Sequence, residues 1–329
     1  MRVKNVIMKL LESREPAVKL KTYLRLLEYD YDSSTIKKLV KNIKKDSPLI
    51  SSLFSFLPKD EKSYEFHAYN KWYGIHWVLA SLADIGYPLS DGDLIPSRNL
   101  ELNWLLSDEH WSKRKTIAGR KRFCASIEGN ALYSILSLGL DDGRCSKLAD
   151  RLVKYQWDDG GWNCDKHPEA INSSYHESLI PMRALNVYAR ITNNKASRIA
   201  VNRAAELFLK RKLFRSLKNN EIIHNKWIKL HYPPFWHYDT LMALKILAEA
   251  DKIRDSRCNE ALNILESKQL SDGGFPAEAK YYQSANTRKS HYSPANWGGT
   301  SKIKMNEWVT IDALYVLKLA KRYDVEVNC

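Results

Sequence analysis

Two short segments of the sequence decide the fold. The segment Gln156-Trp157-Asp158-Asp159-Gly160-Gly161-Trp162 is matched by Gln269-Leu270-Ser271-Asp272-Gly273-Gly274-Phe275. In each copy a leucine, Leu152 or Leu265, stands four residues before the glutamine, and an Arg-Cys pair stands further upstream. Two copies in matched context indicate a repeat architecture, in which one supersecondary unit recurs along the chain.

The sequence around these copies has helical periodicity of two kinds. Residues 145–155 and 258–265 carry apolar side chains three or four positions apart, which is typical of a helix with one buried face. Other segments are apolar almost all round, so their helices must be covered on several sides. These segments are residues 73–85, 131–140, 178–189, 240–250 and 309–320.

The two kinds of helix alternate, which predicts an all-α protein: a single (α/α)6 toroid, or double ring of about twelve helices, formed by residues 1–329 as one domain. We expect inner helices to begin near residues 16, 72, 128, 176, 237 and 307. We expect outer helices near residues 33, 97, 144, 197 and 256, with residues 3–13 as the sixth. No convincing run of alternating apolar and polar residues predicts a strand.

Composition and charge narrow the classes of partner. The 329 residues are 44% hydrophobic and carry a formal charge of +14, which excludes a disordered chain and favours an anionic partner. The densest basic run, residues 110–123, is compatible with a diphosphate clamp, a contact with a membrane surface or a solvated loop. Nucleic acid is not expected, because no nucleic-acid-binding signature accompanies the charge.

A cytoplasmic location is expected. The first sixteen residues do not form a secretory signal, and no uncharged apolar stretch is long enough to span a bilayer. The cysteines are odd in number and widely spaced, which favours reduced thiols over a disulfide framework. They are Cys124, Cys145, Cys164, Cys258 and Cys329.

The glutamine segments resemble the Gln-Trp repeats of the squalene cyclase and protein prenyltransferase superfamily, whose members are α/α toroids. The resemblance covers roughly residues 70–320. It implies an isoprenoid substrate and, because toroids of this family work with a second helical subunit or domain, an unidentified protein subunit as a partner. In the family these segments tie helix ends together, so they specify the fold rather than the reaction.

If all inner helices point the same way, their N-terminal ends converge at one opening of the ring, where helix dipoles and free N–H groups favour an anion. Side chains at these helix starts are therefore candidate site residues. The candidate catalytic residues are Glu128, His176, Glu177, His237, Asp239 and Glu307. The candidate substrate-binding residues are Trp72, His76, Arg120, Asn130, Trp236, Tyr238 and Trp308. For the acids at positions 128, 239 and 307, a helix cap or a partner of the helix dipole is the alternative.

A divalent metal, zinc or magnesium, is a further hypothesis for this opening. The prenyltransferase resemblance implies zinc ligands at Glu128, Asn130 and His176, although Asn130 stands where the family has a thiolate. A second arrangement consists of Cys164, Asp165 and His167 together with His176. In the first arrangement only His176 agrees with the ligand type of the family, and in the second Cys164 and His167 have a spacing that zinc sites tolerate.

The leading hypothesis is a prenyltransferase-like or terpenoid-cyclase-like protein that acts on an isoprenoid with an anionic head. The Asp-x-Asp-Asp and Asp-Asp-x-x-Asp acid motifs of cyclases and terpene synthases are absent from the sequence. Because α/α rings also carry polysaccharide lyases and hydrolases, a carbohydrate reaction is the alternative, with Glu177, Asp239 and Glu307 beside tryptophans. A non-catalytic toroid that binds a lipid or a protein is the third hypothesis.

Overall fold

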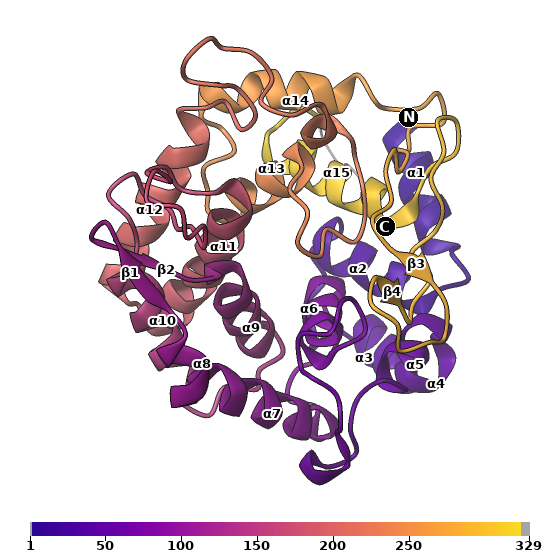
Figure 1. Ribbon diagram of the computed structural model, residues 1–329. Helices are drawn as coiled ribbons and strands as arrows, with labels where there is room; N and C mark the ends of the chain where they lie inside the picture. Colours follow the sequence, from indigo (N-terminus) through magenta and orange to yellow (C-terminus); the bar gives the residue numbers. More distant parts are fainter. Residues whose placement is uncertain (1, 324–329) are drawn as a thin grey trace.

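Six helices form a closed inner ring in the computed structural model, which describes residues 2–323. They are α2 (Pro16–Arg25), α6 (Ile75–Ile85), α9 (Ala125–Ser137), α11 (Tyr175–Thr192), α13 (Thr240–Glu249) and α15 (Glu307–Leu319). Each packs against the next in this order, and α15 packs back against α2. Figure 1 shows the six helices around a common centre.

The remaining helices lie outside this ring (Figure 1). They are α1 (Arg2–Leu11), α3 (Ser34–Val40), α4 (Ile43–Asp46), α5 (Pro48–Phe54), α7 (Ile95–Leu106), α8 (Asp108–Ser112), α10 (Cys145–Lys154), α12 (Lys195–Leu209) and α14 (Asn259–Glu266). Short 3-10 helices occupy the connections: η1 (Glu61–Ser63), η2 (Gly92–Leu94), η3 (Asn225–Ile228) and η4 (Ser256–Cys258). Helix α1 takes the sixth outer position, as predicted.

The predicted all-α toroid is confirmed, and each inner helix begins within three residues of its expected start. The two kinds of periodicity explain this agreement. Residues 240–248 of α13 are all buried, as a helix covered on every side requires. By contrast, α10 buries only the stripe formed by Cys145, Leu148, Ala149 and Leu152.

The two glutamine segments make the same backbone contacts. The Trp162 N–H donates to Ser178 Oγ at 3.0 Å, and the Phe275 N–H donates to Thr310 Oγ1 at 2.9 Å. Ser178 and Thr310 both lie in the first turn of the next inner helix, α11 or α15. Each segment therefore ties the end of one outer helix to the start of the inner helix that follows it.

Two short strand pairs are present that the sequence did not predict. Strands β1 (Lys115–Ile117) and β2 (Arg120–Arg122) form an antiparallel hairpin, and β3 (Gln283–Ser284) pairs in parallel with β4 (Tyr292–Ser293). Ala118 and Gly119 form the hairpin turn with φ of 49° and 73°, and positive φ at both residues suits a two-residue turn. Strands of two or three residues are too short to show periodicity.

Ion pairs cross the lumen, by which we mean the space that the six inner helices enclose. Asp84 of α6 contacts the amino groups of Lys21 and Lys245 at 2.8 and 2.6 Å and the Arg183 guanidinium at 3.0 Å. Asp312 of α15 also pairs with Lys21 and Lys245, in each case at 2.9 Å. All five side chains are buried, and each carboxylate is compensated by several cations.

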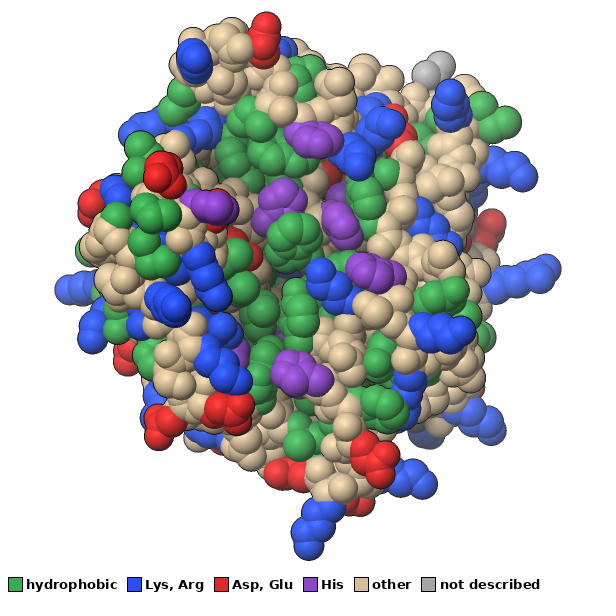
Figure 2. Space-filling model, in the orientation of Figure 1, with side chains coloured by type: hydrophobic (Ala, Val, Ile, Leu, Met, Phe, Trp, Pro, Cys, Tyr) green, Lys and Arg blue, Asp and Glu red, His purple; other side chains and the backbone are tan. Residues whose placement is uncertain are grey.

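The two ends of the ring differ. At the mouth, by which we mean the end where the inner helices begin, all connections except residues 12–15 are long: residues 55–74, 107–124, 155–174, 210–239 and 267–306. At the far end the connections are short: residues 26–33, 86–94, 138–144, 193–194 and 250–258. All ten tryptophans and all nine histidines lie in the mouth connections or in the helical turns beside them. Figure 2 shows histidine and hydrophobic side chains gathered on this face.

Candidate functional site

The lumen is closed directly beneath the mouth by residues 232–235. The Tyr232 hydroxyl donates to Asp84 at 3.0 Å, and the ring of Phe235 stacks on Trp72 with centroids 4.7 Å apart. Cavities beneath this segment hold about 30 and about 10 Å³, room for one or two water molecules. At the inner-helix starts, where a pocket was predicted, these two small cavities therefore lie beneath an open surface.

Stacked rings stand half-exposed on this surface. Trp236 stacks on His176 with ring centroids 4.5 Å apart, and His237 stacks on Tyr281 with centroids 4.1 Å apart. Lys71 lies beside them, its Nζ 5.5 Å from the centre of the Trp236 ring. Of these five residues, the sequence predicted the three at positions 176, 236 and 237. The other two, Lys71 and Tyr281, lie in mouth connections, outside the helix starts and the glutamine segments.

Several histidines of the mouth are neutral at pH 7. Burial, together with Arg114 and other nearby cations, lowers the pKa of His110 to about 4. Burial and, to a lesser extent, His224 lower the pKa of His176 to about 4, and burial, His231 and other positive neighbours lower that of His237 to about 3. These three histidines therefore contribute no positive charge to this face at pH 7.

His76 and Asn130 contact each other instead of facing solvent. Asn130 Nδ2 donates to His76 Nε2 at 3.1 Å, and His76 Nδ1 lies 2.5 Å from Glu101 Oε1. All three side chains are buried. Glu101 comes from the outer helix α7, so nothing in the sequence pattern of the inner helices pointed to it.

Asp239 and Tyr238 stabilise the start of α13. Asp239 Oδ1 accepts from the Met242 N–H at 2.7 Å, as a helix cap does, and Asp239 Oδ2 lies 2.7 Å from His231 Nδ1. The Tyr238 hydroxyl donates to the Leu213 carbonyl at 2.6 Å. The hydrogen bonds of Asp239 therefore support its alternative role as a helix cap.

The other predicted residues lie at separate places around the mouth. Glu128 is buried against Arg151 at 3.0 Å, and burial raises its pKa to about 7. Glu307 is the half-buried first residue of α15, and the neighbouring Trp308 is buried. Arg120, on β2, lies over the Trp157 ring at 5.5 Å.

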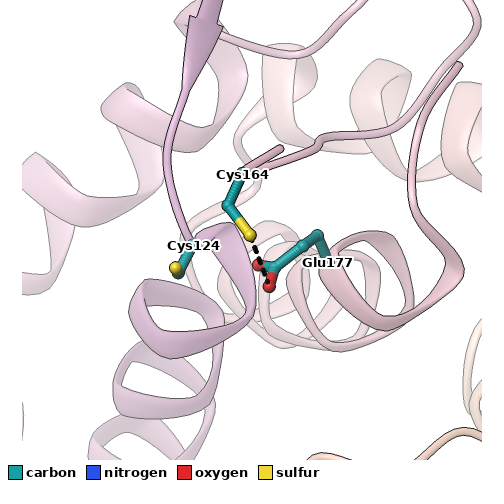
Figure 3. Close-up of side chains that lie close together, drawn as sticks. All are labelled: Cys124, Cys164 and Glu177. Atoms are coloured by element: carbon teal, nitrogen blue, oxygen red, sulfur yellow. Dashed lines mark hydrogen bonds between the residues drawn. The ribbon is translucent and has the colours of Figure 1, made fainter. Parts of the chain in front are cut away.

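Two thiols and a carboxylate converge at the mouth, as Figure 3 shows. Cys124 directly precedes α9, Cys164 follows the first glutamine segment, and Glu177 lies in the first turn of α11. Their ligand atoms all lie within 4.8 Å of one another, and Cys164 Sγ lies 3.5 Å from Glu177 Oε1. Burial raises the pKa of the Glu177 carboxyl, and the Ser126 N–H donates to its Oε2 at 2.9 Å.

This cluster corrects the predicted metal ligands. Asp165 and His167 are exposed and bond within their own loop, where the His167 N–H donates to Asp165 Oδ1 at 3.0 Å. Within residues 2–323, Cys164 is the only predicted ligand that joins a cluster of three ligand-type side chains. Sequence reasoning missed Cys124, whose position immediately before an inner helix was the available signal. Cys329 lies outside the described residues.

A larger cavity of about 390 Å³ opens at the far end, lined by Arg25, Tyr133, Arg190, Glu249 and Tyr315 among others. Its arginines and acids balance, and the Arg25 guanidinium lies 5.4 Å from the Tyr315 ring centre and 3.8 Å from Glu249. The sequence did not indicate this cavity. No helix within the described part of the chain is long and apolar enough to cross a membrane.

Comparisons with known proteins add little beyond the fold. No protein-family model and no curated protein matches the chain. Among solved structures, the GH76A alpha-1,6-mannanase from Salegentibacter sp. HEL1_6 is similar, with a TM-score of 0.42 and 12% sequence identity over 96% of this chain and 88% of that one. Likeness at this level carries no argument about the site. The toroid implied by the glutamine segments is present, whereas no match supports membership of the squalene cyclase family.

Proposed function

We propose that the mouth binds an anionic polysaccharide and cleaves it by β-elimination. The observation that carries the proposal is the group of half-exposed stacked rings, Trp236 on His176 and His237 on Tyr281, beside Lys71. Flat rings can cover the apolar face of a sugar, and an ammonium group can bind the carboxylate of a uronate. The formal charge of +14 favours a polyanion as well.

The small volume beneath the mouth weighs against an isoprenoid bound at the inner-helix starts. A buried ligand of that size requires a pocket of roughly 300 Å³ or more. The cavities beneath the mouth hold about 30 and about 10 Å³, because residues 232–235 and the ion pairs of Asp84 occupy the space. A polymer that lies across the surface needs no such cavity.

The residues of the mouth suit the steps of an elimination. A base removes the proton from the carbon beside the uronate carboxylate, the bond from the next carbon to the glycosidic oxygen breaks, a double bond forms between the two carbons, and the oxygen gains a proton. His237, neutral at pH 7, accepts the first proton, the Tyr281 phenol donates the second, and Lys71 offsets charge on the carboxylate. Burial is the main cause of the low pKa of His237 and Lys71 is a lesser one, so a carboxylate bound to Lys71 would relieve only part of the shift.

Hydrolysis fits the arrangement less well, because it requires two carboxyl groups that face each other across the bond. Glu128 is already paired with Arg151, and Asp239 with His231. Of the other predicted acids, Glu177 lies on α11 and Glu307 lies on α15. Because α13 stands between these two helices in the ring, the two acids do not form such a pair.

The test is incubation with polyuronates and, in parallel, with neutral mannan. Elimination produces new reducing ends together with an ultraviolet-absorbing unsaturated uronate, whereas hydrolysis produces reducing ends alone. We expect the first result for the wild type and for Ile191→Ala, an exposed control at the far end. We expect a loss of about a hundredfold or more for Lys71→Ala and His237→Ala, with unchanged circular dichroism. Failure to cleave any polyuronate would reject the proposal. In that case, parallel binding assays with prenyl diphosphate, lipid vesicles and single-stranded nucleic acid would identify the class of ligand that the mouth binds instead.

A further inference from the structure

We infer that Cys124, Cys164 and Glu177 bind a zinc ion at the mouth. The prenyltransferase resemblance implied a different set of ligands, namely Glu128, Asn130 and His176. None of these residues belongs to the present cluster, although Glu177 is adjacent to His176 in the sequence. The inference does not depend on the reaction proposed above, because it rests on the donor set and its surroundings.

One pair of ligand atoms in the cluster has the separation that a tetrahedral zinc ion requires. A sulfur about 2.3 Å and an oxygen about 2.1 Å from a tetrahedral zinc ion are about 3.6 Å apart. Cys164 Sγ and Glu177 Oε1 are 3.5 Å apart, and Cys124 Sγ completes a set within 4.8 Å. The three side chains come from separate loops and helix starts, and Figure 3 shows Cys164 and Glu177 in contact with Cys124 beside them.

Glu177 differs from the other buried carboxylates of the described chain in its lack of a cationic partner. Each of the others has a lysine, arginine or histidine nitrogen within 3.0 Å: these are Asp84, Glu101, Glu128, Asp239 and Asp312. Glu177 instead contacts the Ser126 N–H and the Cys164 thiol. A buried carboxylate without a counterion is unfavourable, and a metal cation between it and two thiolates would supply the missing charge.

The ligand types select zinc rather than magnesium or calcium. Magnesium and calcium take oxygen ligands, whereas thiolates select zinc and other soft metals. Three protein ligands, rather than four, is the number found in zinc sites that keep one position open for a further ligand. The alternative use of two such thiols is a disulfide between Cys124 and Cys164, and the structure has both as free cysteines.

Metal content and thiol protection test the inference without any activity assay. Protein purified under reducing conditions and supplied with zinc should hold about one zinc ion per chain by elemental analysis. Cobalt should replace zinc and give the thiolate-to-metal absorption of a sulfur-bound ion. Cys124→Ser and Cys164→Ser should each lose the ion, and Glu177→Gln should bind it at least about tenfold more weakly. The matched control is Cys145→Ser, a buried cysteine on α10 outside the cluster, which should retain zinc.

A measurement on the wild-type chain covers the case in which a variant fails to fold. Under native conditions, zinc should slow alkylation of Cys124 and Cys164, and a chelator should restore their reactivity, as peptide mapping would show. Three results would each overturn the inference. They are a wild-type zinc content no higher than that of the Cys124→Ser and Cys164→Ser variants, a cobalt-bound protein without thiolate-to-metal absorption, and a Cys124–Cys164 disulfide under these conditions.

Discussion

Lys245 Nζ lies 2.6 Å from Asp84 Oδ1, and this ion pair joins α13 to α6, helices that stand opposite each other in the ring. Asp84 also forms ion pairs with Lys21 and Arg183. Its carboxylate therefore links α6 to three other inner helices, α2, α11 and α13. Although burial opposes its ionisation, these cations hold the pKa of Asp84 well below its usual value. The toroid is thus held together through its middle as well as between neighbours.

Asp84→Asn should strongly destabilise the fold, because it leaves three buried cations with one carboxylate fewer. We expect the free energy of unfolding to fall by about 3 kcal/mol or more in urea denaturation. Asp93→Asn, which removes an exposed partner of Lys44, is the control and should cost about 1 kcal/mol or less. Equal losses in the two variants would show that the central ion pair contributes little.

The two glutamines of the repeat should differ in their contribution to stability. Gln156 Nε2 donates to Gly160 O and Ala200 O, both at 2.8 Å, and so reaches the next outer helix. Gln269 Nε2 donates only to Gly273 O, at 2.9 Å, within its own turn. At about 1 kcal/mol per bond, Gln156→Ala should lower the melting temperature about twice as much as Gln269→Ala. The reverse order in a calorimetric scan would contradict this assignment.

Gly160→Ala should be far more damaging than Gly143→Ala. Both glycines have positive φ, 98° and 94°, so each substitution carries a strain of about 1 kcal/mol. A Cβ on Gly160 would lie 2.2 Å from the carbonyl oxygen of Arg203, whereas a Cβ on Gly143 would have no neighbour within 4 Å. Thermal denaturation should therefore show a small shift for Gly143→Ala and a large loss of stability for Gly160→Ala. Similar shifts would mean that α12 moves aside easily.

Glu128 should make the stability fall as the pH rises. Burial raises its pKa from 4.5 to about 7, so the folded state keeps a proton that the unfolded state loses between these values. This difference destabilises the folded state by about 3 kcal/mol once the pH exceeds 7. Glu128→Gln retains an acceptor for Arg151 but should remove this part of the pH dependence of urea unfolding. The control is Glu65→Gln, at an exposed position, which should keep the pH dependence of the wild type. An unchanged pH dependence in Glu128→Gln would mean that the Glu128 carboxyl is ionised at every pH tested.

The sequence revealed the ring because its signals are local. A helix such as α13 shows its burial through its own apolar residues, and the Gly-Gly turns show where outer helices end. The lumen was hidden, because one lysine or aspartate in an apolar helix, such as Lys21 or Asp84, does not reveal its partner on another helix. The closure of the pocket by residues 232–235 was hidden for the same reason.

The candidate site was predictable only in part. His176, His237 and Trp236 were identifiable because they stand at inner-helix starts, and all three lie on the mouth surface. The cluster of Cys124, Cys164 and Glu177 was not, since its members are up to 53 positions apart and meet only when three separate segments fold together. Pairing of thiols across loops depends on tertiary structure, which spacing alone does not encode.

The confinement of all ten tryptophans to one end of the ring has a spectroscopic consequence. Intrinsic indole fluorescence of the folded protein reports on the mouth alone. A compound that occupies the cavity of about 390 Å³ at the opposite end would perturb tyrosines, such as Tyr133 and Tyr315, and leave the indole emission unchanged. Emission excited selectively at the indoles therefore distinguishes, without a label, which end of the molecule a compound has bound.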